Sequence, residues 1–241
     1  MKRYRVGRLL AVAIALESGV AAAASDIDQL QNLAQDQFRL LSEDMGAAFS
    51  YKAMAPAAPL GITGFDVGIV LSGTSLENEA ALELATSGDA PSVLPMPRLH
   101  VLKGLPGNFD IGATYVGVPG TDIKLWGAEL RWALVEGGIA IPAVGLRGSM
   151  TRLDGIEELD FGTKAIDISV SKGFVFATPY AGVGQVWVTS TPKNVPLSEE
   201  TFSLTKMFAG VSMKFLLVNM VFEVDKTGDA TTYGAKLGLK F

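Results

Sequence analysis

The chain ends in the segment Tyr233-Gly-Ala-Lys-Leu-Gly-Leu-Lys-Phe241, which decides the fold class. Its odd-numbered positions carry tyrosine, alanine, leucine, leucine and phenylalanine, whereas its even-numbered positions carry only glycine and lysine. Successive side chains of a β-strand point to opposite faces, so a period of two indicates a strand. The segment therefore predicts a strand with one apolar face and one face of glycine and lysine.

The same alternation recurs along the chain from about residue 61. Residues 109–115 carry apolar or aromatic side chains at odd positions, and the apolar positions of 126–132 alternate with Gly127, Glu129 and Arg131. The pattern predicts ten strands, near residues 61–73, 97–103, 108–117, 122–134, 138–151, 159–172, 174–190, 201–213, 216–226 and 231–241.

The predicted strands are long, and their connections alternate between short and long. Most reach the length of about 9 to 11 residues that a tilted strand needs to cross a bilayer. Short turns at one end and long loops at the other are typical of a membrane barrel. We therefore predict an all-β fold, a closed antiparallel transmembrane β-barrel of about 10 strands within a range of 8–12, with a short N-terminal amphipathic helix. A soluble sandwich or lipocalin-like barrel also alternates and is the alternative.

Charged residues fall on the polar faces of the predicted strands, and aromatic residues cluster near strand ends on the apolar faces. A polar lumen and interfacial aromatic girdles would explain both, which favours the membrane barrel. A soluble sandwich could equally place the charges on its solvated outer face. The residues expected to line the lumen are Asp66, Arg98, His100, Asp110, Glu129, Arg131, Arg147, Asp167, Lys206, Glu223, Asp225 and Lys236.

The composition excludes several classes of protein. Hydrophobic residues make up 49% of the chain and charged residues 19%, with a mean hydropathy of +0.32. No apolar run of about 18 residues follows residue 24, which excludes a multi-span helical membrane protein, and the high hydrophobicity excludes disorder. The chain has no cysteine and one histidine, His100, so disulfide frameworks and His- or Cys-rich metal sites are excluded. We expect no metal and no cofactor.

Residues 1–24 have the organisation of a secretory signal peptide. Four basic residues precede the apolar stretch Leu9–Leu16, and Ala22-Ala23-Ala24 follows. We expect cleavage after Ala24, since Glu17 and Ser18 interrupt the run and disfavour a retained membrane anchor. Cleavage removes four basic residues and one acid, which leaves 16 basic and 24 acidic residues and a net charge of −8. This balance argues against nucleic acid as a partner.

Taken together, the signal peptide, the absence of cysteine, the glycine-rich alternating strands and the terminal segment 233–241 resemble Gram-negative outer-membrane β-barrel proteins. In that group a C-terminal strand ending in phenylalanine is read by the barrel-assembly machinery. The resemblance implies that Tyr233 and Phe241 belong to an assembly signal, that the C-terminus is periplasmic, and that the protein contacts outer-membrane lipid and lipopolysaccharide in the bacterial outer membrane. Residues 123–131 and 223–229 resemble an uncharacterised proteobacterial outer-membrane family, from which no catalytic residue can be carried over.

The predicted domains are the signal peptide (1–24), an N-terminal helix and linker (25–59) and the barrel (60–241). Apolar residues recur at helical spacing from Ser25 to about Met45, with Ser25 and Asp28 as a possible cap. A ten-stranded lumen that already holds charged side chains has little room for a helix about 10 Å wide. We expect the helix on the periplasmic side, beneath the barrel mouth or against a partner; a solvated tail is the alternative. A helix inside the barrel would imply about 12 or more strands.

Two functions remain open for such a barrel. About eight strands are filled by their own side chains, whereas about 16 to 18 leave an aqueous channel. One hypothesis is a narrow polar pore for ions or small solutes. The residues expected to select by charge in it are Arg98, Glu129, Arg131, Arg147, Asp167, Lys206 and Glu223. The alternative is a non-conducting structural or interaction barrel with acidic extracellular loops and an ion-paired, filled interior.

The predicted long loops are acidic. They could concentrate cations or hold divalent ions between lipopolysaccharide phosphates, and a merely solvated surface is the alternative. The loop acids are Glu77, Glu79, Glu83, Asp89, Asp154, Glu157, Glu158, Glu199 and Glu200.

We expect no enzymatic activity. A barrel lipase or deacylase needs a serine next to a base, and the sequence offers one imidazole, His100, and no G-x-S-x-G segment. We therefore name no catalytic residue.

Overall fold

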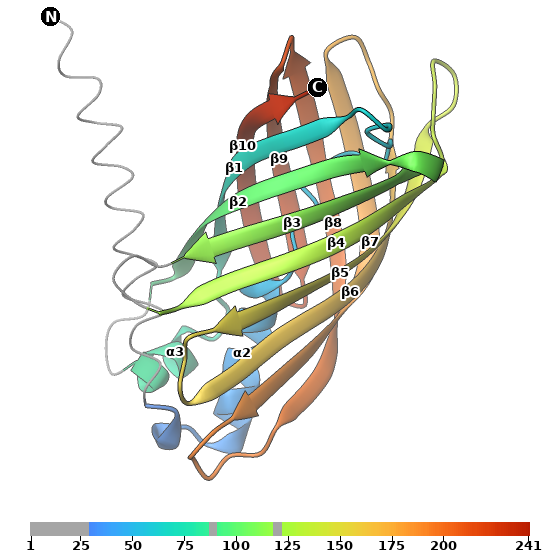
Figure 1. Cartoon of the computed structure of the whole chain (residues 1–241). Coiled ribbons are helices and arrows are strands. Elements are labelled where there is room, and N and C mark those ends of the chain that lie inside the picture. Colours follow the sequence, from blue (N-terminus) through green and yellow to red (C-terminus); the bar gives the residue numbers. More distant parts are fainter. Residues whose placement is uncertain (1–28, 87–90, 118–121) are drawn as a thin grey trace, which may run out of the picture.

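Ten antiparallel strands form one closed barrel in the computed structural model, which describes residues 29–86, 91–117 and 122–241 (Figure 1). Each strand pairs with the next in the chain, and the last pairs with the first. The strands are β1 (Phe65–Ser75), β2 (Val93–Leu105), β3 (Phe109–Gly117), β4 (Lys124–Val135), β5 (Ala143–Asp154), β6 (Leu159–Ser171), β7 (Ala177–Pro192), β8 (Glu200–Phe215), β9 (Val218–Thr227) and β10 (Ala230–Lys240). The predicted closed ten-stranded barrel is confirmed.

The period of two in the sequence corresponds to the two sides of the barrel wall. In β4 the side chains of Trp126, Leu130 and Trp132 are exposed on the outside, whereas those of Glu129 and Arg131 are buried inside. The apolar face therefore points outward and the charged face inward, which is the arrangement of a barrel whose outer surroundings are apolar.

Closure of the barrel joins the first and last strands. β1 and β10 pair from Asp66 opposite Lys240 to Ser75 opposite Thr231. Beyond this ladder, the backbone of Phe241 exchanges two hydrogen bonds with Phe65, at 2.7 and 2.9 Å. The sheet therefore closes on itself and has no first or last strand with a free edge along its whole length.

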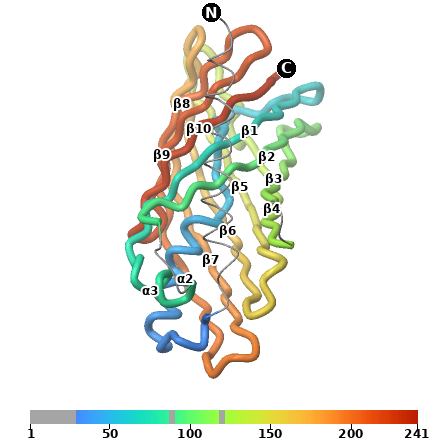
Figure 2. The backbone as a smooth tube through the Cα atoms, turned by 90° about the vertical axis from the view of Figure 1, so that its left-hand side faces the viewer, coloured from blue at the N-terminus to red at the C-terminus, as the bar shows by residue number. Residues whose placement is uncertain are grey.

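The barrel has two different ends (Figures 1 and 2). The helix end carries the turn η1 (Leu30–Asn32), the helices α2 (Gln35–Phe49) and α3 (Glu79–Thr86), and the connections that follow β1, β3, β5, β7 and β9. The C-terminal end carries Phe241, the short turn η2 (Pro106–Asn108) and the connections that follow β4, β6 and β8. No helix among the described residues is long and apolar enough to cross a bilayer.

Helix α2 lies inside the helix end of the barrel, where it contacts six strands: β1, β6, β7, β8, β9 and β10. Phe38, Leu41 and Met45 join the same buried core as the inward-facing wall residues Phe161 and Val188. The expectation that the helix packs beneath the mouth next to the C-terminus is therefore wrong. The expectation that an internal helix requires about 12 or more strands is also wrong.

The physical reason is that the helix fills only one end of the lumen. There the inner faces of the long strands β7 and β8 carry apolar residues, and the helix buries its own apolar side chains against them. The helix ends at Phe49, whose ring meets that of Phe161 edge-on at 5.7 Å. Beyond this point the chain continues as an extended segment, which needs less width than a helix. The predicted cap at Ser25 and Asp28, like the signal peptide, lies outside the described residues.

Candidate functional site

Residues 50–60, here called the luminal segment, run through the barrel from α2 towards the C-terminal end (Figure 1). The segment has no regular secondary structure, and its residues from Ser50 to Ala57 are buried. Alanine at positions 53, 55, 57 and 58 keeps the segment narrow. The lumen of this barrel is thus occupied by the chain itself, and the functional question becomes how firmly the wall holds that segment.

Cationic side chains of the wall donate to carbonyl oxygens of the N-terminal part of the segment. Arg98 on β2 donates from Nη1 to the carbonyl of Ser50 at 3.1 Å and from Nη2 to that of Ala48. Lys206 on β8 donates to the carbonyl of Tyr51. A buried carbonyl without a partner would be costly, so each of these bonds favours the segment in its observed place.

Acidic side chains of the wall accept from backbone N–H groups further along. Glu223 on β9 accepts from Met54 N at 2.8 Å, and also from the hydroxyl of Tyr180 at 2.7 Å. Asp110 on β3 accepts from Leu60 N at 3.0 Å. Two further wall residues complete the series, with Arg131 donating to the carbonyl of Pro56 and Ser171 accepting from Ala58 N at 3.3 Å.

The segment contributes one charge of its own, on Lys52. Its ammonium lies 3.0 Å from Asp225 and also donates to the carbonyl of Ala47 at 2.8 Å and to the hydroxyl of Thr232 at 3.2 Å. Asp225 in turn lies 3.1 Å from Lys206. One buried carboxylate therefore bridges a lysine of the segment and a lysine of the wall.

A second cluster lies around Arg147 on β5. Its guanidinium contacts Asp167 at 2.8 Å and lies 3.6 Å from Glu129, which is also 3.6 Å from Nε2 of His100. Both of the latter distances are too long for hydrogen bonds. Between the opposite charges of Arg147 and Glu129, 3.6 Å is short enough for strong attraction in a buried site. The ring of Tyr51 in the luminal segment packs 6.1 Å from that of His100, so this cluster also contacts the segment.

A third cluster lies on β1, β9 and β10. Lys236 contacts Asp66 at 3.0 Å, and the amide of Asn219 donates to the same carboxylate oxygen at 3.0 Å. The hydroxyl of Ser212 donates to Asn219 at 2.8 Å. This cluster cross-links neighbouring strands of the wall and does not bind the luminal segment through these bonds.

Lys52 of the luminal segment adds a cation to the charged residues of the inner wall. The twelve lumen-lining residues named from the sequence are all buried, at 8% exposure or less. Six of them are carboxylates and five are lysine or arginine, so the ionised wall carries one excess negative charge with His100 neutral. Lys52 supplies the sixth cation. Because Lys52 lies 3.0 Å from the buried Asp225, withdrawal of the segment would remove one cation from beside this carboxylate.

At two glycines of the wall, the wall backbone lies especially close to the luminal segment. A Cβ atom at Gly145 on β5 would lie 3.4 Å from Cβ of Ala57, and a Cβ atom at Gly234 on β10 would lie 2.0 Å from Cε of Met54. A cavity between Ala55, Arg147 and their neighbours has a volume of about 10 Å³, which is the space of a single water molecule. Segment and wall are packed against each other.

The outside of the barrel is apolar between two levels of aromatic residues. Near the helix end these are Tyr115, Trp126, Trp187 and Tyr233, all exposed. Near the C-terminal end they form three stacked pairs, Phe65 with Phe241, Phe109 with Trp132 and Phe176 with Phe215. The two residues of the predicted assembly signal, Tyr233 and Phe241, thus lie outside the barrel and not in its lumen.

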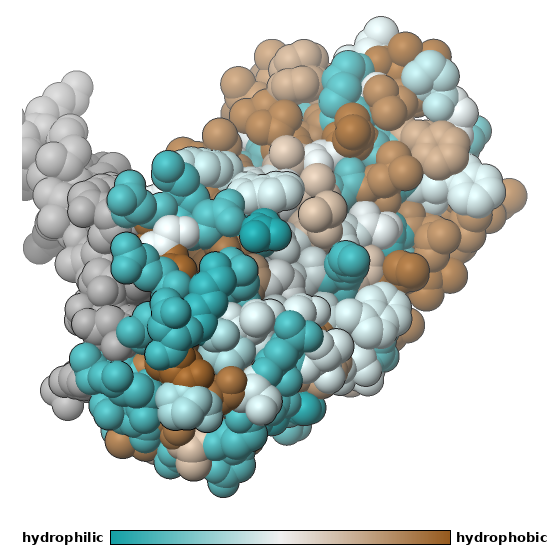
Figure 3. All heavy atoms as spheres, turned by 60° about the horizontal axis from the view of Figure 1, so that its bottom comes forward, coloured by the Kyte–Doolittle hydropathy of each residue, from teal (hydrophilic) through white to brown (hydrophobic). Residues whose placement is uncertain are grey.

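The helix end is polar, and its helices are joined through one buried acid (Figure 3). Asp44 of α2 accepts from the backbone N–H groups of Glu77 and Asn78, at 3.3 and 2.8 Å, which lie just before α3. Burial raises the pKa of Asp44, although these two hydrogen bonds oppose the effect.

The sequence predicts that the acidic residues of the long loops lie together at one end of the barrel. Asp89 lies outside the described residues, and the other loop acids lie at the helix end. Among the described residues, no group of three or more His, Cys, Asp or Glu side chains is placed to hold a metal ion.

Sequence reasoning missed the residues Lys52 and Tyr51 of the segment, their neighbours Tyr180 and Thr232, and Asn219 of the third cluster. The signal for Lys52 was present, because it is the one charge in the small and apolar stretch from Gly46 to Gly61. A lone cation in such a stretch of a barrel protein indicates a buried partner of opposite charge.

No protein-family model and no curated protein matches this sequence. Among solved structures, the chain is similar to the N-terminal β-barrel domain of Pseudomonas aeruginosa OprF, with 14% identity over 73% of this chain and 97% of that chain and a TM-score of 0.39. It is also similar to a loop-deletion mutant of OmpT, an outer membrane protein of Vibrio cholerae (17% identity, 61% and 54% of the chains, TM-score 0.32). A third is Ail of Yersinia pestis (11% identity, 74% and 97%, TM-score 0.33).

Proposed function

We propose that this chain is an outer-membrane barrel whose lumen is closed by its own N-terminal segment, and that it acts as a structural or interaction barrel and not as an open pore. The observation that carries the proposal is the series of wall side chains that hydrogen-bond the backbone of residues 50–60.

The membrane location is supported by the distribution of apolar and charged residues. Ile69, Ile111 and Ile166 are about half exposed on the outer wall. Asp66, Asp110 and Asp167 of the same strands are buried inside. In water such a wall would expose a large apolar surface at high cost. The two aromatic levels match the girdles that membrane barrels place at the two interfaces.

The orientation is supported by the difference between the two ends. At the helix end, β7 and β8 continue past the aromatic level with outward hydroxyl side chains such as Thr189, Thr191 and Thr201. The longest connection, between β1 and β2, is also there. At the C-terminal end no connection approaches that length, and apolar side chains are exposed there, with Val175 and Leu216 almost fully exposed. Because extracellular loops of such barrels are the longer ones, we place the helix end outside the cell.

The closed state is favoured over the polar pore by what the lining residues do. Arg98, Arg131, Asp110, Lys206 and Glu223 are five of the twelve predicted lumen-lining residues, and all except Asp110 belong to the seven candidates for charge selection. Here each of them is hydrogen-bonded to the backbone of α2 or the luminal segment. A solute would have to displace these bonds to pass.

Single-channel conductance of the refolded mature protein in planar bilayers tests the proposal, once heat-modifiable gel mobility has confirmed a folded barrel. We expect a folded barrel without steady conductance. Steady conductance whose ion selectivity changes with Arg131→Glu or Glu129→Lys would contradict the proposal and support the pore. Lys226→Glu is the matched control, because Lys226 points outward on β9 and should not affect selectivity in either case.

The proposal retains the other expectations from the sequence. These are export by residues 1–24, assembly through Tyr233 and Phe241, and membership of an uncharacterised proteobacterial outer-membrane family. We also expect no enzymatic activity, since the one imidazole of the chain, His100, is buried in the wall.

A further inference from the structure

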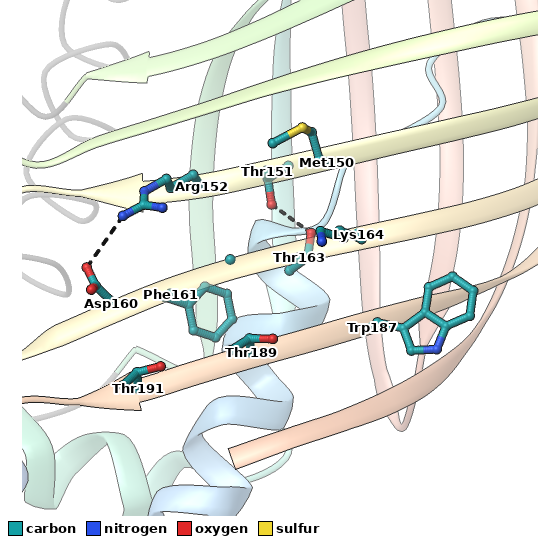
Figure 4. Close-up of a pocket in the computed structure, with 11 residues that line it drawn as sticks. Met150, Thr151, Arg152, Asp160, Phe161, Thr163, Lys164, Trp187, Thr189 and Thr191 are labelled. Atoms are coloured by element: carbon teal, nitrogen blue, oxygen red, sulfur yellow. Dashed lines mark hydrogen bonds and ion pairs between the residues drawn. The ribbon is translucent and has the colours of Figure 1, made fainter. Parts of the chain in front are cut away.

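A groove lies on the outer wall at the helix end, over β5, β6 and β7 (Figure 4). Its volume is about 450 Å³. The strand register explains its shape, because Gly162 lies between Arg152 on one neighbouring strand and Thr189 on the other. The missing side chain of Gly162 leaves a notch with a cation on one side and a hydroxyl on the other.

Lys164 lies at the next outward position of β6, directly opposite Met150 on β5 and Trp187 on β7 (Figure 4). Its side chain has no hydrogen bond or ion pair with any described residue. A lysine on the lipid-facing side of a barrel is strongly destabilising at the bilayer centre and costs little at the interface. Its position beside Trp187, a girdle residue, places the ammonium where lipid headgroups lie.

The rim of the notch carries more positive than negative charge. Arg152 lies 3.1 Å from Asp154 and 3.8 Å from Asp160, and Lys193 lies 2.9 Å from Asp160. Among the residues that line the groove itself, Arg152 and Lys164 are cations and Asp160 is the one carboxylate. Glu199 lies further out and accepts from Thr191 at 2.8 Å. All four side chains of these ion pairs are 43–55% exposed, so the pairs are weak and an incoming anion could replace a carboxylate.

An apolar trough continues the groove towards the middle of the wall. It shares Met150 and Lys164 with the notch, is also lined by Ala128 and Leu130, and has a volume of about 480 Å³. Its floor is open because Gly148 has no side chain, and a Cβ atom added there would meet no atom within 4 Å. Notch and trough together form a site with a cationic, hydroxyl-bearing end and an apolar end.

We propose that this groove binds a phosphorylated glycolipid of the outer leaflet. A phosphate would lie in the notch at Gly162, between the guanidinium of Arg152 and the ammonium of Lys164, with the hydroxyl of Thr189 as a further donor. An acyl chain would lie in the trough over Gly148. Such a lipid carries the phosphate anion and the acyl chain in one molecule, joined through its headgroup. The assignment to a glycolipid rests on the orientation proposed above, which places the groove in the outer leaflet.

Native mass spectrometry of the refolded mature protein in detergent tests this inference, with bisphosphorylated lipid A, dephosphorylated lipid A and phosphatidylglycerol as probes. We expect retention of bisphosphorylated lipid A and at least a tenfold loss of affinity in the Arg152→Gln/Lys164→Gln variant. Gly148→Leu should also weaken binding by filling the trough. Lys226→Gln, which removes an outward lysine of the same end on β9, should bind like the wild type.

The site would be overturned if Lys226→Gln lost as much affinity for lipid A as the Arg152→Gln/Lys164→Gln variant. It would also be overturned if dephosphorylated lipid A bound as well as bisphosphorylated lipid A. Equal binding of phosphatidylglycerol would overturn the assignment to a glycolipid.

The orientation is tested separately by labelling a cysteine introduced at Glu157 in intact cells with a membrane-impermeant reagent. Labelling without lipid A binding refutes this inference alone, whereas binding without labelling refutes the orientation on which the glycolipid assignment rests. The single-channel conductance that tests the closed lumen is independent of both results.

Discussion

Lys52 and Asp225 are 173 positions apart in the sequence, yet their charged groups lie 3.0 Å apart in the interior of the barrel. Their side chains are 2% and 1% exposed. The pair joins the luminal segment to β9, and through Asp225 the segment also contacts Lys206. Desolvation makes such a pair costly to break, because the remaining partner stays buried with its charge unmatched.

Replacing Lys52 with methionine should therefore destabilise the barrel. Removal of one partner of a buried ion pair costs about 3–5 kcal/mol, and we expect the lower end of this range because Lys206 remains beside Asp225. The measurement is urea unfolding in lipid vesicles, followed by tryptophan fluorescence. Lys193→Met is the matched control: its ion pair with Asp160 has a similar length, 2.9 Å, but is 43% and 45% exposed. The control should lose less than about 1 kcal/mol, and equal losses would refute a buried role for Lys52.

Gly234→Val should displace the luminal segment, since even a Cβ atom at this position would lie 2.0 Å from Cε of Met54. We expect a loss of about 1–3 kcal/mol from overpacking. Met54→Ala in the same chain should recover part of this loss by making room for the valine. Gly148→Val serves as control, because its side chain would point into open space on the outer wall. A Gly234→Val variant that unfolds like the wild type would show that Met54 is not held at β10.

The pH dependence of stability should include a contribution from Asp44. Its raised pKa means that the folded state binds the proton more tightly than the unfolded state. This contribution to stability is present below the unfolded pKa of about 3.9 and is lost as the pH rises through the folded pKa. Asp44→Asn should therefore gain stability relative to the wild type between about pH 4 and pH 7.

The urea concentrations at the unfolding midpoints, measured at about pH 4 and about pH 7, test this effect. Asp36→Asn, which changes an exposed acid in the first turn of α2, is the control and should follow the wild type at both pH values. A constant difference between Asp44→Asn and the wild type across this range would refute the contribution.

Deletion of Phe241 should reduce assembly in cells more than it reduces stability after refolding. Phe241 stacks on Phe65 at a centroid distance of 5.7 Å, and Phe215 stacks on Phe176 at 6.1 Å, so the two contribute similar contacts to the same girdle. Phe215→Ala is therefore the control for lost packing. If the chain end is an assembly signal, the yield of folded barrel in the outer-membrane fraction falls for the deletion and not for Phe215→Ala. Equal yields would contradict the signal.

The strands could be predicted because each carries the same physical pattern. In residues 109–115 and 233–241 an apolar outside and a polar inside impose a period of two. Helices do not have this period. Strand ends were less predictable. The first strand begins at Phe65 and not near Gly61, because Gly61 to Gly64 form a turn whose hydrogen bond joins Gly64 N to the carbonyl of Gly61 at 2.9 Å.

Two features of the helix end were not predicted. Helix α3 lies in the stretch assigned to a long loop, although Ala81, Leu82 and Ala85 have helical spacing and are buried. The internal position of α2 was excluded on the assumption that a helix would fill the whole lumen. The sequence does not show that the chain changes from a helix to a narrow extended segment at Ser50, since that change depends on hydrogen bonds supplied by distant wall residues such as Arg98.

The charged residues of the site could be named from the alternation, but their pairing could not. Asp225 and Lys206 were both expected inside, yet which cation each acid contacts depends on the register between strands. Their role also changed, because side chains considered for solute selection contact the chain's own backbone.

Disulfide trapping tests the occupied lumen most directly. The natural chain has no cysteine, and a Cβ atom at position 145 would lie 3.4 Å from that of Ala57, close to the separation of about 3.5–4.5 Å found in disulfides. In outer membranes from cells that express Ala57→Cys/Gly145→Cys, we predict a disulfide within a folded, heat-modifiable barrel. Ala57→Cys/Gly148→Cys, with its second cysteine on the outer face of the same strand, should form none. Two free thiols in the first variant, or equal cross-linking in both, would contradict a luminal segment that closes the barrel.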